Sequence, residues 1–253
     1  MPTEAERGID CDVTGASPGL SDSDKARSAG RADFMKRFFS VAVSVGFASK
    51  IGDFKFLSSL TVPNAEQLHQ LVLLMFAMVI VVGSWEFYFV SIEKRPLIDW
   101  QRFTTDIIIV SLYIVLLLSV KNFDVFLFYL LLIMLAYIAL DVLSMRAHPR
   151  QYGLPKFSVS NVARLYKNGA LNYTGKTETT KIGPFITLWW FVVYSLLFWF
   201  HLGCAAKFYS VAVASVVAYI FYRMDQVNHW PLYKRALGSA LIFVLLFFVE
   251  TIV

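Results

Sequence analysis

The sequence predicts an all-α fold: a polytopic bundle of about seven transmembrane helices with its amino terminus in the cytoplasm. Three observations predict it. Hydrophobic residues fill 57% of the 253 positions and charged residues 16%, against roughly a quarter charged in soluble proteins. The apolar residues gather into runs long enough to span a bilayer as helices. Basic residues gather in the segments between alternate runs, as expected for loops retained in the cytoplasm.

The stretch from residue 104 to residue 145 sets the topology. It holds two apolar runs separated only by residues 121 to 124, so it predicts a transmembrane hairpin. Lys94, Arg95 and Arg102 precede the hairpin, Arg146 and Arg150 follow it, and its tip carries Lys121. Because cationic loops are retained inside, both open ends are predicted to be cytoplasmic and the tip to lie outside.

Residues 1 to 36 contain no apolar run and are rich in small and polar residues, which predicts a basic cytoplasmic tail without fixed structure. Residues 37 to 145 are predicted to form the first four transmembrane helices. The first of these, residues 38 to 60, carries polar Ser40 and Ser44. It is predicted to cross the membrane sheltered by its neighbours, with a helix lying in the interface as the alternative. Ser40, Ser44 and Ala48 recur every four positions, as do Ala42 and Gly46, which suits close helix packing.

Residues 68 to 90 are predicted to return the chain to the cytoplasm. After the hairpin, residues 146 to 183 form a long cytoplasmic loop with a predicted amphipathic helix. Its apolar positions are Val159, Val162, Ala163 and Tyr166, and Ser158 is the predicted cap of its start. This helix is predicted either to lie on the inner leaflet or to pack under the bundle.

Residues 184 to 253 are predicted to form the last three transmembrane helices. The middle one carries a small-residue face at a spacing of four, which consists of Ala206, Ser210, Ala214 and Ala218. Small side chains let helix backbones approach closely in a membrane, so this helix is predicted to lie in the bundle interior.

The charge distribution supports seven crossings. Of the lysines and arginines close to the spans, 18 fall on the predicted cytoplasmic side and four outside. A six-crossing arrangement would place the amino terminus and its five nearby basic residues outside, so it is rejected. The expected location is the bacterial inner membrane.

Three acids, Glu86, Asp106 and Asp141, fall near the cytoplasmic ends of three different predicted spans. Acids at one level can line the mouth of a cation pathway or a proton relay. They can also form structural ion pairs with arginines at the same level, namely Arg102, Arg146 and Arg223. Both alternatives stay open on the sequence alone.

Motifs for enzymatic, nucleotide or metal chemistry were not found, so no enzyme activity, no cofactor and no metal are expected. The net charge of +5 is assigned to membrane orientation and anionic headgroups, and no nucleic acid is expected as a partner. The two cysteines fall on opposite sides of the membrane and are not expected to pair.

Two functional hypotheses remain. The favoured one is a membrane protein that forms or gates a route for ions or small solutes, as a self-associating homo-oligomer. The alternative is a non-catalytic membrane subunit or effector, of an envelope complex or of anti-phage defence, whose cytoplasmic loops bind a partner protein.

Overall fold

The computed structural model of the chain describes residues 22–54, 64–94, 100–147, 149, 156–164, 183–204, 208–228 and 230–252. Within these ranges the protein is all-helical, without a strand. The long helices are α1 (Asp22–Ile51), α3 (Ala65–Lys94), α4 (Trp100–Leu118), α5 (Phe123–Ala147), α7 (Gly183–Cys204), α8 (Phe208–Asn228) and α9 (Leu232–Ile252). A short helical segment covers residues 159–164.

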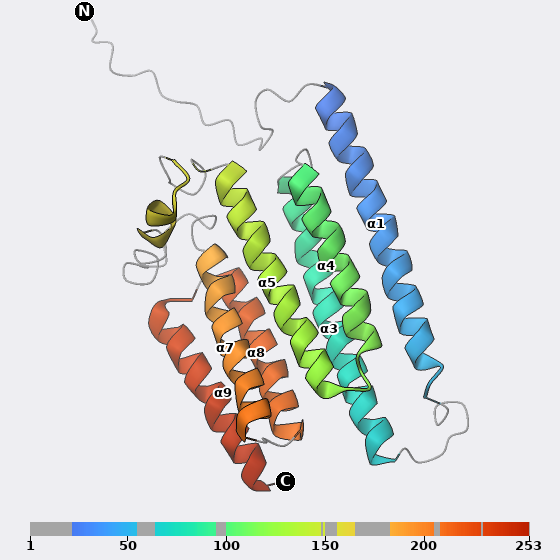
Figure 1. Cartoon of the computed structure of the whole chain (residues 1–253), viewed down its shortest axis with the longest axis vertical. Helices are drawn as coiled ribbons and strands as arrows, with labels where there is room; N and C mark the ends of the chain where they lie inside the picture. The colour runs from blue at the N-terminus through green and yellow to red at the C-terminus, as the bar shows by residue number, and fades with distance from the viewer. Residues whose placement is uncertain are drawn as a thin grey trace, which may run out of the picture.

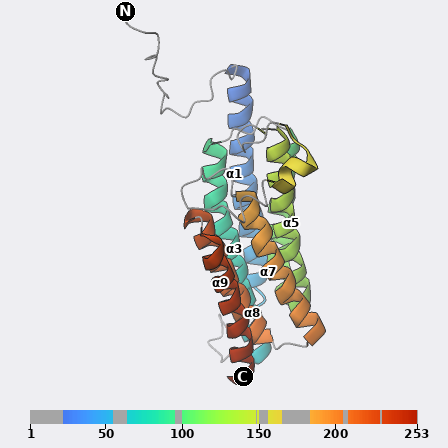
Figure 2. The ribbon, with the colours of Figure 1, turned by 90° about the vertical axis from the view of Figure 1, so that its left-hand side faces the viewer.

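The long helices run side by side and alternate in direction, so their connections collect at the two ends of one bundle (Figure 1). α1 lies at one edge and α9 at the other (Figure 1). α1 packs mainly on α4, α4 on α5, α5 on α7, and α8 on both α7 and α9. Viewed from the α9 side, α7, α8 and α9 form a group in front of α3 and α1 (Figure 2).

Five of these helices are long and apolar enough to cross a membrane, which makes this a membrane-embedded protein. The five apolar stretches are Ala65–Trp85, Trp100–Leu118, Phe123–Ala147, Pro184–Gly203 and Leu232–Val249. Only 22 to 39% of each stretch is buried inside the protein, so the apolar outer faces require lipid as their solvent. α1 and α8 are long helices of lower apolarity.

Most Lys and Arg side chains of the described residues belong to one end of the bundle, where α1 begins and α3 finishes. We call it the basic end; the other end, where Lys50 and Lys121 lie, is the opposite end. This grouping agrees with the charge bias in the sequence.

The predicted hairpin of residues 104 to 145 is present as α4 and α5, joined at the opposite end by a tight turn. The side chain of Asn122 caps α5, because its Oδ1 accepts a hydrogen bond from the backbone N–H of Val125 at 3.2 Å. α3 begins with a reciprocal cap. Asn64 Oδ1 accepts from the Gln67 N–H at 2.8 Å, and Gln67 Oε1 accepts from the Asn64 N–H at 3.1 Å.

The first helix differs from the prediction at both ends. α1 already begins at Asp22 and stops at Ile51, so residues 22 to 36, which were expected to lack fixed structure, belong to it. The segment contains three Ala, two Lys and two Arg residues, which favour helix. Residues 1–21 lie outside the described residues.

The short segment after α5 starts as predicted from its capping residue. Ser158 Oγ accepts a hydrogen bond from the Asn161 N–H at 3.2 Å. Val162 packs against Met145 at the end of α5, whereas the Val159 side chain is 83% exposed. One side of this segment therefore rests on the bundle, and the other faces away from it. Tyr166 lies outside the described residues.

Candidate functional site

Asp106, Asp141 and Arg223 each lie within two turns of the helix end that faces the basic end. At 1.5 Å per residue, Asp106 lies about 9 Å from the start of α4, Asp141 about 9 Å from the end of α5, and Arg223 about 8 Å from the end of α8. Asp106 is buried, with 1% of its surface exposed. Arg102, Asp141 and Arg223 are half-buried, and Arg146 is exposed. The side chain of Glu86 lies outside what the structure describes.

A set of hydroxyl side chains lies deeper in the bundle than these charges. We call Ser84, Tyr113, Tyr137, Tyr219 and Tyr222 the tyrosine cluster; they come from α3, α4, α5 and α8. The hydroxyls of Tyr113 and Tyr137 are 2.6 Å apart and share a hydrogen bond. The Ser84 hydroxyl is placed to interact with those of Tyr113, Tyr137 and Tyr219. Four helices thus contribute hydroxyl groups to one buried region.

Arg223 links this cluster to the basic end. Its guanidinium lies 5.6 Å from the centre of the Tyr219 ring, a cation–π distance. Its Nη1 donates to Gln226 Oε1 at 2.8 Å, and Gln226 Nε2 donates to the Tyr222 hydroxyl at 2.6 Å. Burial of a charge is tolerable when partners compensate for lost water, and these contacts supply part of that compensation.

The tyrosine cluster also joins α8 to α3. The Tyr219 hydroxyl donates to the backbone carbonyl of Ile80 at 3.1 Å. A Cβ at Gly83 would come within 2.7 Å of that hydroxyl, closer than real Cβ contacts. The absence of a side chain at Gly83 is therefore what allows the Tyr219 ring to reach the α3 backbone.

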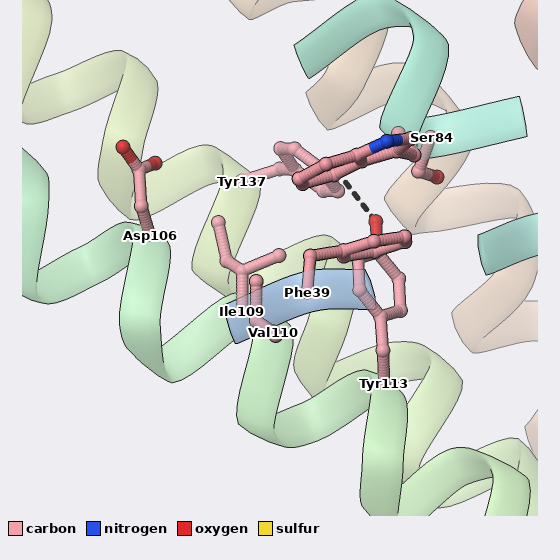
Figure 3. Close-up of a pocket in the computed structure, with 8 residues that line it drawn as sticks. Phe39, Ser84, Asp106, Ile109, Val110, Tyr113 and Tyr137 are labelled. Carbon is pink, nitrogen blue, oxygen red and sulfur yellow. Dashed lines mark hydrogen bonds between the residues drawn. The ribbon is translucent and has the colours of Figure 1, made fainter. Parts of the chain in front are cut away.

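A small cavity lies beside the cluster, between α1, α3, α4 and α5. It has room of about 10 Å³ for the centre of a water molecule, which is space for one water. Ser84, Asp106, Tyr113 and Tyr137 line it together with apolar side chains such as Phe39 and Ile109. Asp106 stands apart from the hydrogen-bonded Tyr113 and Tyr137 across this space (Figure 3).

Between the tyrosine cluster and the opposite end, large apolar side chains fill the interior of the bundle. We call these the apolar layer; it consists of Phe76, Leu116, Leu117, Phe126, Leu127 and Leu130, each at most 3% exposed. The rings of Phe76 and Phe126 are 5.7 Å apart, and Phe76 also contacts the Tyr219 ring at 6.5 Å. The polar region therefore meets tightly packed apolar side chains about halfway through the bundle.

A second buried polar group joins α7, α8 and α9 at the basic end. Asp225 and Arg235 are fully buried, with Arg235 Nε donating to Asp225 Oδ2 at 2.6 Å and Arg235 Nη2 to Asp225 Oδ1 at 3.0 Å. Trp190 Nε1 donates to Oδ2 at 3.0 Å, and the Trp230 N–H donates to Oδ1 at 2.8 Å. Four donors thus satisfy one carboxylate. Asp225 and Arg235 were not predicted, because the 223 to 235 loop reads in sequence only as polar and basic.

The small-residue positions are placed as follows. On α8, Ser210, Ala214 and Ala218 are fully buried, and Ala206 lies outside the described residues. On α1, Ser40 and Ser44 are exposed, whereas Ala42 and Gly46 face inward. A Cβ at Gly46 would lie 3.2 Å from a side-chain methyl of Leu117, so α1 approaches α4 through the Ala42 and Gly46 series and not through the serines.

The opposite end of the bundle carries an exposed ion pair. Lys121 Nζ, at the tip of the α4 to α5 hairpin, lies 3.0 Å from Asp53 Oδ2, just beyond the end of α1. Hydrogen bonding to Lys121 lowers the pKa of the Asp53 carboxyl below its ordinary value. Nearby, His201 Nε2 lies 2.7 Å from Asp124 Oδ1 and connects the end of α7 to the start of α5.

The described residues hold no group of three or more His, Cys, Asp or Glu side chains that could bind a metal ion. Comparisons with protein-family models, with curated proteins and with solved structures gave no match to this chain.

Proposed function

We propose that this protein crosses the membrane seven times and forms or gates a route for ions or small solutes. The observation that carries the proposal is the buried polar region formed by Asp106, Arg223 and the tyrosine cluster. Ionisable side chains inside a membrane bundle are costly, and where they occur they often mark ion pathways or proton relays. Here they extend from the basic end to about the middle of the bundle.

Placing the polar region at the cytoplasmic side follows from the seven-crossing topology. In this proposal α1 and α8 also span the membrane, the basic end faces the cytoplasm and the location is a bacterial inner membrane. The alternating directions of the long helices and the position of the basic residues support it.

Cysteine accessibility tests this topology. In a variant without Cys11 and Cys204, a single cysteine at Asn122 should react with an impermeant maleimide added outside. Single cysteines at Leu97 and Asn172 should react only after the membrane is opened. Reaction of the cysteine at 122 only from inside would overturn the proposed orientation.

The apolar layer gives the route a closed state. A constriction of packed apolar side chains excludes water and therefore ions, and it opens when the helices separate enough for water to enter. Asp106 and Arg223 would lie in a vestibule on the cytoplasmic side of this layer. The acids there would raise the local concentration of cations.

Flux through purified protein in liposomes tests the route. Asp106→Asn and Asp141→Asn should lower cation flux while thermal stability in detergent is retained, because each removes charge but keeps shape. Asp33→Asn, which removes an exposed acid near the same end, is the matched control and should keep wild-type flux. If the acids serve only as ion-pair partners, both buried-site variants should instead lose stability with no change in flux.

The proposal includes self-association into a homo-oligomer, as expected from the sequence. The size and symmetry of the particle in detergent test this part. A ring with a central axis would support a route between copies, and a monomer that still conducts would place the route inside each copy.

The second candidate function is a membrane subunit or effector without transport activity. The segment at 159–164 favours it, because Val159 is 83% exposed on a helix that already rests on α5. Wild-type liposomes no leakier than empty ones, together with loss of a co-purifying protein on Val159→Asp, would favour this candidate over the route. Neither candidate assigns enzymatic chemistry to the chain.

A further inference from the structure

We infer that the junction of α1 and α4 at the basic end binds the headgroup of an anionic phospholipid, with the Arg31 guanidinium donating to the lipid phosphate. This site needs only that the protein is embedded in a membrane and does not depend on the proposed route. Three features point to it: the level of the junction in the membrane, the rings that hold Arg31 there and the charge of the surrounding helix surface.

Trp100 places the junction at the membrane surface. The apolar stretch of α4 begins at this residue, so the membrane-embedded part of α4 starts here. The Trp100 side chain is 65% exposed, and indole rings favour the headgroup level, where one end meets water and the rest meets lipid. α1 packs on α4 and continues past its start (Figure 1), so α1 residues in contact with Trp100 lie at the same level.

Arg31 of α1 is held against α4 by aromatic rings. Its guanidinium carbon lies 5.7 Å from the centre of the Trp100 ring and 5.4 Å from that of Phe103, which are cation–π distances. A guanidinium can stack on rings and still donate hydrogen bonds through the N–H groups in its plane. Its five N–H donors match the oxygen atoms of a phosphate, often two at a time. The rings therefore fix a phosphate-binding group at the headgroup level.

The aromatic side chains beside Arg31 form a surface for the apolar part of a lipid. Phe34 is 50% exposed, and its ring centre lies 5.9 Å from that of Phe103 and 5.8 Å from that of Phe38. The Trp100 ring lies 5.6 Å from Phe103. Exposed rings next to a cation suit a ligand that joins a phosphate to acyl chains, whereas a soluble anion gains nothing from them. The junction therefore suits a lipid better than free phosphate.

The surrounding surface of α1 favours a headgroup with net negative charge. Residues 26 to 37 carry four basic side chains, Arg27, Arg31, Lys36 and Arg37, against the single acid Asp33. Arg27 is exposed one helical turn before Arg31, on the same face of α1. Basic residues at a membrane surface attract anionic lipids. A zwitterionic headgroup would bring its own cation close to Arg27 and Arg31, so it should bind more weakly.

Melting of the purified protein in an uncharged detergent tests the site, because a ligand that binds the folded state raises the melting temperature. Phosphatidylglycerol should raise it at lower concentration than phosphatidylcholine with the same acyl chains. Arg31→Gln should increase about tenfold the phosphatidylglycerol concentration that gives half of the shift, as expected when a charge-assisted hydrogen bond is lost. Trp100→Leu, at an exposed position, should also increase this concentration, because it removes one of the two rings that hold Arg31.

Arg37→Gln is the matched control. Arg37 lies on the same helix, but its side chain is 80% exposed and pairs with Asp33 at 3.0 Å, so its loss should change the half-shift concentration by less than about twofold. Equal effects of Arg31→Gln and Arg37→Gln would overturn the site, because the attraction would then belong to the whole basic surface. No effect of either Arg31→Gln or Trp100→Leu would also overturn it.

The choice of ligand is tested in the same assay. Equal shifts with phosphatidylglycerol and phosphatidylcholine would overturn the preference for an anionic headgroup. Inorganic phosphate that raises the melting temperature as much as phosphatidylglycerol, over the same concentration range, would show that the ligand is a soluble anion and would overturn the assignment to a lipid.

Discussion

The interior of the bundle differs between its two halves. Toward the basic end, between α3, α4, α5 and α8, it contains Asp106, Arg223 and the tyrosine cluster. Arg223 and the hydroxyls of Tyr113, Tyr137 and Tyr219 have hydrogen-bond partners there. Toward the opposite end, the same helices meet through the apolar layer, for example the contact between Phe76 and Phe126. The polar half owes its structure to satisfied hydrogen bonds, and the apolar half to close packing.

This difference shows where a barrier to water lies. In the proposed route, polar groups in the first half give water and ions a place to enter, whereas the apolar layer offers them no hydrogen bond. Mutations should therefore act by different mechanisms in the two halves. In the polar half they should remove charges or hydrogen bonds, and in the apolar half they should open cavities.

The largest expected effect is in the buried ion pair at the basic end. Arg235→Ala leaves the Asp225 carboxylate buried without its main partner, so we expect a loss of about 3 to 5 kcal/mol in unfolding free energy. Lys234→Ala, the exposed neighbour, should change it by less than about 0.5 kcal/mol. Unfolding in detergent followed by circular dichroism measures both.

The double variant Asp225→Leu with Arg235→Met sharpens this test. Removing both charges and keeping apolar volume should recover part of the lost stability, because no charge is left stranded. The recovery is incomplete because Nε1 of Trp190 and the Trp230 N–H lose their acceptor. A double variant as unstable as Arg235→Ala would show that the packing of these side chains, and not their charge, holds α8 to α9.

The next effect is a cavity in the apolar layer. Leu127→Ala should cost about 2 to 4 kcal/mol, since the neighbours of this 2% exposed side chain cannot fill the space. Leu135→Ala on the same helix, where the side chain is 49% exposed, should cost far less because lipid replaces it. Equal losses in thermal stability for the two variants would mean that a different face of α5 packs against the bundle.

A smaller effect is expected from overpacking on α8. Ala214→Leu adds bulk at a fully buried position and should lower the unfolding free energy by about 1 to 3 kcal/mol. Val213 is 40% exposed, so Val213→Leu should leave the unfolding free energy nearly unchanged. Equal melting temperatures of the two variants would show that the Ser210, Ala214 and Ala218 face is not the packed one.

The smallest effect concerns pH at the opposite end. Because Lys121 lowers the pKa of Asp53 in the folded protein below its ordinary 3.8, the pair stabilises the fold above that pH. This contribution is lost as pH falls through the lower, folded-state pKa. Below about pH 4, the melting temperature of Asp53→Asn should therefore change less steeply with pH than that of the wild type. Identical acid profiles would show that the pair adds nothing measurable, as is common for exposed ion pairs.

The helical hairpin and the Ser158 cap could be predicted from sequence because they depend on local patterns. The two apolar runs around residues 121 to 124 became α4 and α5, and Ser158 caps its segment. The start of α1 at Asp22 was missed, because hydropathy reports membrane spans and says little about a helix that continues beyond them.

The polar interior could be predicted only in part. Asp106, Asp141 and Arg223 stand out in sequence because charges are rare in apolar runs. Tyr113 and Tyr137 do not, since a tyrosine in such a run looks like any other aromatic residue. Their pairing depends on how α4 and α5 are rotated, which is set by the contacts of α1 and α3 with α4 and of α7 with α5. The Asp225 and Arg235 pair likewise depends on the turn between α8 and α9 and on Trp190 from α7.

The pairing of Asp225 with Arg235 bears on how the protein is inserted during synthesis. The two residues are ten positions apart, so the pair needs only the turn between α8 and α9 to form. In the proposed topology this loop is cytoplasmic. Once the pair has formed, the Arg235 charge is neutralised and contributes less to retaining the loop there. We therefore expect the orientation of the α8 and α9 hairpin to depend on Arg223 and Lys234 more than a count of basic residues implies.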